Sequence, residues 1–173
     1  MTDDSQIFAF EHDFAGTLHC IPMIVRFKLD LCGVKLSLRQ WNRFERRERE
    51  QLIFRPCDAA HQIAAYRAYL VMLISVRAGE QAVDLPVEVD PEWEACANVP
   101  GLVKAKAASL GLPAPAQPSW AALTPLQRFT LLKLSRGGHD NENFTPALRE
   151  FGLLNPVGVP TSIETGSLKV ELR

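Results

Sequence analysis

The sequence predicts a mainly α-helical protein that folds as a single compact domain of six or seven helices. Three observations support this fold class. Between residues 22 and 151 most segments repeat apolar residues every three or four positions, the spacing of one helix face. Several of these segments follow a helix-starting residue such as Pro22 and end at a glycine such as Gly33. The length of 173 residues, of which 47% are hydrophobic, suits one domain with a buried core.

The first 54 residues contain two predicted helices and a charged run. Pro22–Cys32 forms the first helix, in which apolar residues occupy a broad face. A short helix begins at Ser37, whose hydroxyl can cap a helix start, and runs through Trp41 to Phe44. The mixed charges of Glu45–Glu50 are typical of a solvated helical face, where residues three or four apart form ion pairs.

The longest predicted helix covers Ala59–Arg77. Asp58 can cap its start, and Gly79 can end it. Its apolar residues form two stripes, which predict a central helix that is contacted from more than one side. One stripe contains Ile63, Tyr66, Leu70, Leu73 and Ile74, and the other contains Ala65, Tyr69, Met72 and Val76.

The segment Glu80–Asn98 differs from its surroundings in charge. It contains six acidic residues and no lysine or arginine, and prolines interrupt it, so we expect a connector anchored to the core by Trp93. From Ala95 to His139 the chain instead carries lysine and arginine and no acid. We expect the two segments to complement each other within the fold, the alternative being a polar surface that steers a partner.

Three more helices are predicted after the connector. They cover Val103–Leu110, Pro125–Ser135 with Thr124 as the N-cap, and Phe144–Phe151. Trp120 opens a short turn between the first two.

The two ends of the chain have weaker patterns. Gln6–Phe10 could form a short strand, and Ser167–Leu172 alternates apolar and polar residues, so these segments could form a small β pairing near Ile7. We therefore expect a helical domain over residues 1–154 and a loose tail over residues 155–173.

Three stretches resemble the nitrate reductase-associated protein family: Phe10–Trp41, Pro56–Leu70 and Leu123–Leu153. The similarity spans about residues 6–154. The resemblance implies an accessory or maturation protein that binds assimilatory nitrate reductase, an enzyme with a molybdenum cofactor and an iron–sulfur cluster. It brings no catalytic residues with it. We therefore expect a binding protein rather than an enzyme, with no cofactor of its own, and any link to those cofactors would pass through the partner.

Two alternatives rest on cysteine and histidine side chains. A metal or cofactor carrier could use His19, Cys20, Cys57 and His61, since thiolates and imidazoles are good ligands. Cys57 and His61 are four residues apart, a spacing that can place both on one helix face. Cys20 and Cys32 lie near opposite ends of a helix and cannot share one ion. A small thiol enzyme could instead use Cys20, because a helix start favours the thiolate.

The polar segment between the last two helices is the preferred surface for a partner or an anionic ligand. Arg136, His139 and Asn143 are its candidate contacts. The same residues also have structural roles, since Arg136 and His139 can bind helix-terminal carbonyls and Asn143 can cap the next helix.

Composition argues against several other functions. The formal net charge is −1, whereas nucleic-acid binders usually carry a basic excess. No apolar run approaches the ~20 residues that span a bilayer, and Met1–Phe10 lacks the basic start of a signal peptide. We therefore expect a cytoplasmic protein that binds neither nucleic acid nor membrane.

Overall fold

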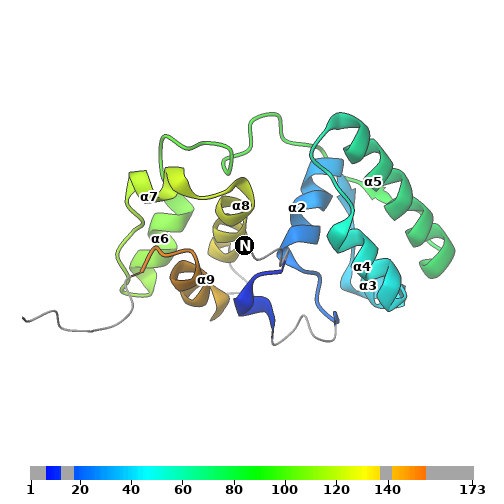
Figure 1. Ribbon diagram of the computed structural model, residues 1–173, viewed down its shortest axis with the longest axis horizontal. Helices are drawn as coiled ribbons and strands as arrows, with labels where there is room; N and C mark the ends of the chain where they lie inside the picture. Colours follow the sequence, from blue (N-terminus) through cyan, green and yellow to red (C-terminus); the bar gives the residue numbers. More distant parts are fainter. Residues whose placement is uncertain (1–6, 13–17, 137–141, 155–173) are drawn as a thin grey trace, which may run out of the picture.

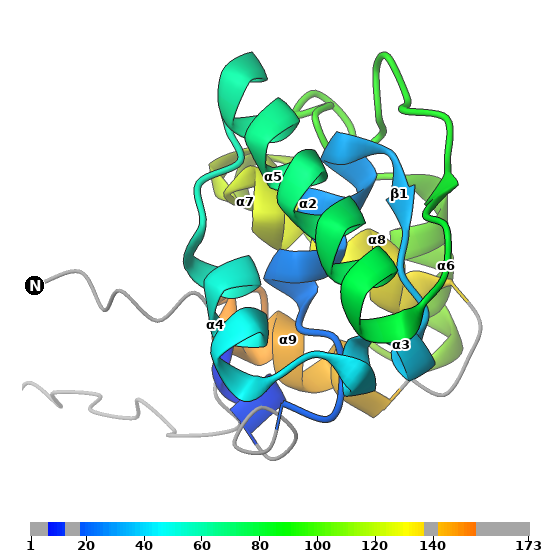
Figure 2. The ribbon, with the colours of Figure 1, turned by 90° about the vertical axis from the view of Figure 1, so that its right-hand side faces the viewer.

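The computed structural model of the chain describes residues 7–12, 18–136 and 142–154 (Figures 1 and 2). Within these residues the protein is mainly α-helical and forms a single compact domain, as the sequence predicts. The described helices are α2 (Met23–Cys32), α3 (Leu38–Arg43), α4 (Arg46–Phe54), α5 (Ala60–Leu73), α6 (Gly101–Ser109), α7 (Gln117–Ala122), α8 (Pro125–Ser135) and α9 (Phe144–Glu150). A 3₁₀ turn, η1 (Ala9–Glu11), precedes them, and a π-helical turn, η2 (Ile74–Ala78), extends α5.

Helix boundaries follow the predicted start and stop signals closely. The hydroxyls of Ser37 and Thr124 accept the backbone N–H groups of Gln40 and Gln127, both at 3.2 Å, and so cap α3 and α8. Gly33 ends α2 with a φ of 65°. The described residues contain eight α-helices rather than six or seven, because Gln117–Ala122 forms a helix where only a turn was expected.

The predicted cap at Asp58 is wrong. Ala59 is the residue that precedes the first turn of α5. Since alanine has no side-chain acceptor, the amide oxygen of Gln62 takes the backbone N–H groups of Asp58 and Ala59, at 3.0 and 2.9 Å. A side chain inside the helix therefore replaces the expected cap.

The predicted strand at Gln6–Phe10 is also wrong over its described part. Ala9–Glu11 forms a 3₁₀ turn because a carboxylate, not a neighbouring strand, binds its backbone. Glu150 accepts the N–H groups of Ala9 and Phe10, at 2.8 and 3.0 Å. The proposed pairing partner, Ser167–Leu172, lies outside the described residues. The described sheet is elsewhere: β1 (Val34–Lys35) pairs antiparallel with β2 (Val83–Asp84).

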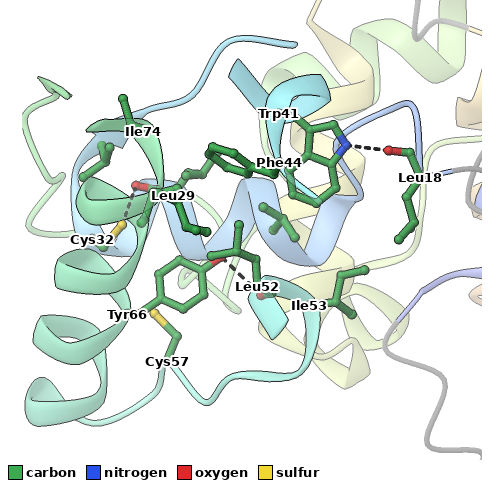
Figure 3. Close-up of a cluster of buried hydrophobic side chains, with 14 residues drawn as sticks. Leu18, Leu29, Cys32, Trp41, Phe44, Leu52, Ile53, Cys57, Tyr66 and Ile74 are labelled. Carbon is green, nitrogen blue, oxygen red and sulfur yellow. Dashed lines mark hydrogen bonds between the residues drawn. The ribbon is translucent and has the colours of Figure 1, made fainter. Parts of the chain in front are cut away.

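Helix α2 lies at the centre of the molecule, with α3, α4 and α5 on one side and α8 on the other (Figure 1). Its two faces contribute side chains to two different hydrophobic clusters. Val25, Leu29 and Cys32 belong to the cluster shared with α3, α4 and α5, which includes Trp41 and Tyr66 (Figure 3). Met23, with the partly buried Phe27 and Leu31, belongs to the cluster shared with the connector and α6–α9. One helix therefore joins the two halves of the core.

Helix α5 was predicted to be central, and this is wrong. Its inner stripe is buried as expected, with Tyr66, Leu70 and Leu73 all at most 1% exposed. Most of its second stripe faces outward: Ala65, Met72 and Val76 are exposed, and only Tyr69 is partly buried. Two apolar stripes in the sequence show that a helix has apolar residues on more than one face. They do not show whether another element packs against the second face.

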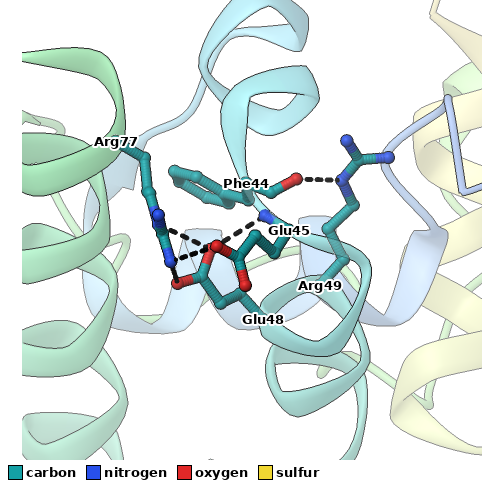
Figure 4. A network of polar contacts seen from close by, with 5 residues as sticks. All are labelled: Phe44, Glu45, Glu48, Arg49 and Arg77. Atoms are coloured by element: carbon teal, nitrogen blue, oxygen red, sulfur yellow. Dashed lines mark hydrogen bonds and ion pairs between the residues drawn. The ribbon is translucent and has the colours of Figure 1, made fainter.

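The charged run at Glu45–Glu50 is helical, as predicted, and Arg46 pairs with Glu50 at 2.9 Å. It is not only a solvated face, because Arg77 of η2 binds its start (Figure 4). The guanidinium of Arg77 lies 2.6 Å from the carboxylate of Glu45 and 2.8 Å from that of Glu48. This network connects the start of α4 to the end of α5.

Cations from other elements bind the carbonyl ends of four helices. The Lys28 ammonium donates to Ile53 O and Arg55 O at the end of α4, at 2.5 and 2.8 Å. The Arg67 guanidinium donates to Cys32 O at 2.9 Å, at the end of α2. Two further arginines act in the same way: Arg49 donates to Asn42 O and Phe44 O at the end of α3, and Arg128 donates to Leu123 O at the end of α7. The last carbonyls of a helix lack partners within it, so each cation satisfies groups that would otherwise be orphaned.

None of the helices in the described part of the chain combines the length and apolar character that a membrane span needs.

Candidate binding groove

A hollow of about 260 Å³ lies where the end of α2, the connector and the end of α8 meet. We call it the connector groove. A smaller hollow with several of the same residues adjoins it and brings in Glu92 and Phe129. The lining of the connector groove consists of Asp30 and Leu31 from α2, Leu85, Pro86, Val87, Glu88, Pro91, Trp93 and Glu94 from the connector, and Lys133 and Arg136 from α8 and its end.

The connector wall is held against the turn that ends α2. The N–H of Leu85 donates to Gly33 O at 2.9 Å and so extends the β1–β2 pairing. The approach is close enough that a Cβ on Gly33 would lie 2.7 Å from Leu85 O and 2.8 Å from a methyl carbon of Val87. Glycine at this position therefore permits both the left-handed turn and the contact that forms the wall.

The far end of the connector is anchored by Trp93, as predicted. Its side chain is only 9% exposed, and its ring packs edge-on against Phe27 at 4.9 Å between centroids. Its carbonyl oxygen accepts the Nε–H of the buried Arg128 at 2.7 Å. The connector is thus fixed at Gly33 and at Trp93, and the residues between these two points form the wall.

The connector presents apolar side chains to solvent between its fixed points. Val87 is 54% exposed and Val89 is 90% exposed, and the alternate positions Val83 and Leu85 are also exposed. Exposed apolar side chains that lie together beside a hollow mark interaction surfaces more often than isolated ones do.

The charges at the groove are not balanced. Asp30 and Lys133 pair with each other at 2.8 Å. The carboxylates of Glu88, Glu92 and Glu94 are exposed, and none forms an ion pair with a described residue. Apart from the Asp30–Lys133 pair, the groove therefore has more acidic than basic side chains. Arg136 is the basic residue that remains among these lining residues.

Among the described residues no ion pair joins the acidic connector to the basic segment after it, although Lys133 and Arg136 line the same hollows as Glu88 and Glu92. The connector acids that do pair use cations from earlier elements: Glu80 pairs with Arg39, and Asp84 pairs with Arg67. The remaining acids stay in solvent. This distribution favours the alternative interpretation, a polar surface that faces a partner.

The three residues predicted for a partner surface have different locations. Arg136 lines the groove. Asn143 precedes the first turn of α9 without capping it through its side chain, and it does not line the groove. His139 lies outside the described residues. The sequence analysis did not identify the connector side of the groove. The pattern that could have indicated it is the alternation of apolar residues within an acidic segment without cations, at Val83, Leu85, Val87 and Val89.

The cysteine and histidine candidates differ in how far their side chains are exposed. His19, Cys20 and His61 are exposed, whereas Cys57 is 2% exposed. Burial raises the pKa of the Cys57 thiol to about 12 and that of Cys32 to about 11, so both are protonated near neutral pH. Across residues 7–12, 18–136 and 142–154, no three histidine, cysteine or acidic side chains gather as a metal site would require.

A family model described as the conserved nitrate reductase-associated protein matches residues 7–151. The match includes all the described helices and every residue of the connector groove. No curated protein and no solved structure matches the chain.

Proposed function

The chain belongs to the conserved nitrate reductase-associated protein family, and we propose that it is an accessory or maturation protein that acts by binding nitrate reductase. The family name supports the association with the reductase. The connector groove supports a mechanism based on protein binding, because it combines a hollow, exposed apolar side chains and unpaired carboxylates.

Two features of the groove suit a macromolecular partner. Its volume of about 260 Å³ is below the ~300–1,000 Å³ that is common for small-molecule pockets. Its apolar wall continues outward to Val89, beyond the hollow itself. A partner could therefore place one or two side chains in the hollow and cover the exposed connector around it.

The test uses nitrate-grown cells of the source organism. The tagged full-length chain should recover nitrate reductase from their lysate, and recovery should persist after purification of both proteins. A strain that lacks the protein should show lower nitrate reductase activity per amount of reductase polypeptide. Failure to recover the reductase, together with normal specific activity in the deletion strain, would reject the proposal.

A further inference from the structure

We propose that the connector groove recognises a segment of the partner in which apolar side chains are flanked by lysine or arginine. This inference rests on the proposed function and adds the chemistry of the contact.

The apolar part of the recognition comes from opposite sides of the groove. Leu31 of α2 and Trp93, the buried anchor of the connector, belong to the core side, and Leu85 and Val87 belong to the exposed stretch of the connector. Leu85 is 43% exposed and Val87 is 54% exposed, so an apolar side chain inserted between these walls would remove both from water. Such burial is favourable by roughly 25 cal/mol per Å² of apolar area.

The charged part comes from the connector residues Glu88, Glu92 and Glu94, with Asp30 of α2 beside them. Four carboxylates, Asp30, Glu88, Glu92 and Glu94, line the two adjoining hollows against two cations, Lys133 and Arg136. Lys133 is already paired with Asp30 and lies over the ring of Phe129. The groove therefore offers unpaired acidic groups to an incoming chain, and complementary charge selects lysine or arginine.

The outer edge of β2 is a poor place to add a strand of the partner. Val83 and Leu85 direct their backbone groups toward β1, since Lys35 pairs with Val83 and Gly33 O accepts the N–H of Leu85. Asp84 and Pro86 therefore face the outer edge, where Pro86 has no N–H to donate. We therefore assign recognition to side chains in the groove rather than to strand addition on β2.

The experiment measures peptide binding to the full-length protein by isothermal titration calorimetry. The probe is the peptide Gly-Lys-Leu-Lys-Leu-Lys-Gly, and its matched control has glutamate in place of each lysine. The lysine peptide should bind, and its affinity should fall as salt is raised. The glutamate peptide should bind at least about tenfold more weakly, since several exposed charge pairs are reversed.

Protein variants locate the binding site. The double variant Glu88→Gln/Glu92→Gln should weaken binding of the lysine peptide by about tenfold, because each lost ion pair contributes up to about 1 kcal/mol. Glu142→Gln removes an exposed acid that does not line the groove and should leave the affinity unchanged. Equal affinity for both peptides, preference for the glutamate peptide, or equal affinity of the double variant and wild type would overturn the inference.

A competition experiment separates this inference from the proposed function. The lysine peptide should displace purified nitrate reductase from the protein, whereas the glutamate peptide should not. If the reductase binds but neither peptide displaces it, the inference fails and the proposed function stands. If the reductase does not bind at all, the proposed function itself fails.

Discussion

Gly33 links the backbone of α2 to the shape of the groove. Its φ of 65° lies in the left-handed region, and the connector backbone lies where a Cβ would project. Gly79 provides a natural comparison, because it has a similar φ of 68° and no atom within 4 Å of the Cβ position.

We predict that Gly33→Ala destabilises the protein more than Gly79→Ala does. Gly79→Ala should lower the free energy of unfolding by about 1 kcal/mol, the cost of a left-handed non-glycine residue. Gly33→Ala should cost at least about 1 kcal/mol more, since Leu85 and Val87 must also move. Urea unfolding of both variants measures this difference. Equal losses would show that the connector does not press on Gly33.

The four thiols differ in accessibility, which gives a test of the core. Cys20 and Cys96 are exposed, whereas Cys32 and Cys57 are buried. Under native conditions two thiols per chain should react rapidly with a disulfide reagent, and the other two should react only upon unfolding. Mass spectrometry of the modified peptides assigns the sites. Rapid native modification of Cys57 would contradict the packing around Tyr66.

The buried thiols also predict how stability depends on pH. A folded-state pKa of about 12 for Cys57 and about 11 for Cys32 means that the folded state keeps protons that the unfolded chain releases above its own thiol pKa of about 9. The free energy of unfolding should therefore fall as pH rises above about 9, by up to about 1.4 kcal/mol per pH unit for each thiol. Lys28, whose pKa burial lowers, contributes in the opposite direction.

The Cys57→Ala variant isolates one thiol. Urea unfolding at several pH values from 8 to 10.5, under reducing conditions, should show a smaller fall in stability for Cys57→Ala than for wild type. Parallel curves for the two proteins would mean that Cys57 titrates alike in the folded and unfolded states.

At the scale of elements, the sequence predicted what depends on local chemistry. The caps at Ser37 and Thr124 and the stop at Gly33 require only nearby residues, and all three are confirmed. The strand expected at Gln6–Phe10 failed because a distant side chain decides the local structure. The Glu150 carboxylate holds the backbone of Ala9 and Phe10 in a turn, and no pattern within that segment indicates it.

The local sequence also gave no indication that cations would bind the carbonyl ends of helices. Lys28, Arg67 and Arg128 each interrupt an apolar stretch. In the sequence, such a charged residue only weakens the prediction of a buried helix face. In the fold, each binds carbonyls at the end of another helix. Their role could not be predicted because it depends on how helices are placed relative to one another.

We predict that Arg128→Met lowers the free energy of unfolding by about 2–4 kcal/mol, since it leaves two buried carbonyls, those of Trp93 and Leu123, without this donor. Arg46→Met is the control: its ion pair with Glu50 is exposed, so the loss should be at most about 0.5 kcal/mol. Chemical denaturation compares the two. Similar small losses would mean that other donors replace the Arg128 guanidinium.

At the scale of the whole molecule, the sequence predicted the fold class but not which helix is central. Helix α2 has this position because its two faces are covered by different halves of the chain, whereas Ala65, Met72 and Val76 of the outer stripe of α5 are exposed. The connector groove was missed for a related reason. Its walls come from three segments far apart in the sequence, and among the predicted site residues that the structure describes only Arg136 lies in it.

We propose that the protein binds nitrate reductase through the connector groove. Two matched substitutions of exposed valines test it: Val87→Lys in the groove and Val76→Lys on η2, where the side chain is 67% exposed. Both variants should fold as wild type does, because neither valine is buried.

The decisive measurement is the affinity of purified nitrate reductase for wild type, Val87→Lys and Val76→Lys at one salt concentration. Lysine at position 87 removes an apolar contact and opposes the proposed basic segment, so binding should weaken by at least about tenfold. Val76→Lys should bind like wild type. Equal affinities of Val87→Lys and wild type, or a loss confined to Val76→Lys, would show that the reductase does not bind at the connector groove.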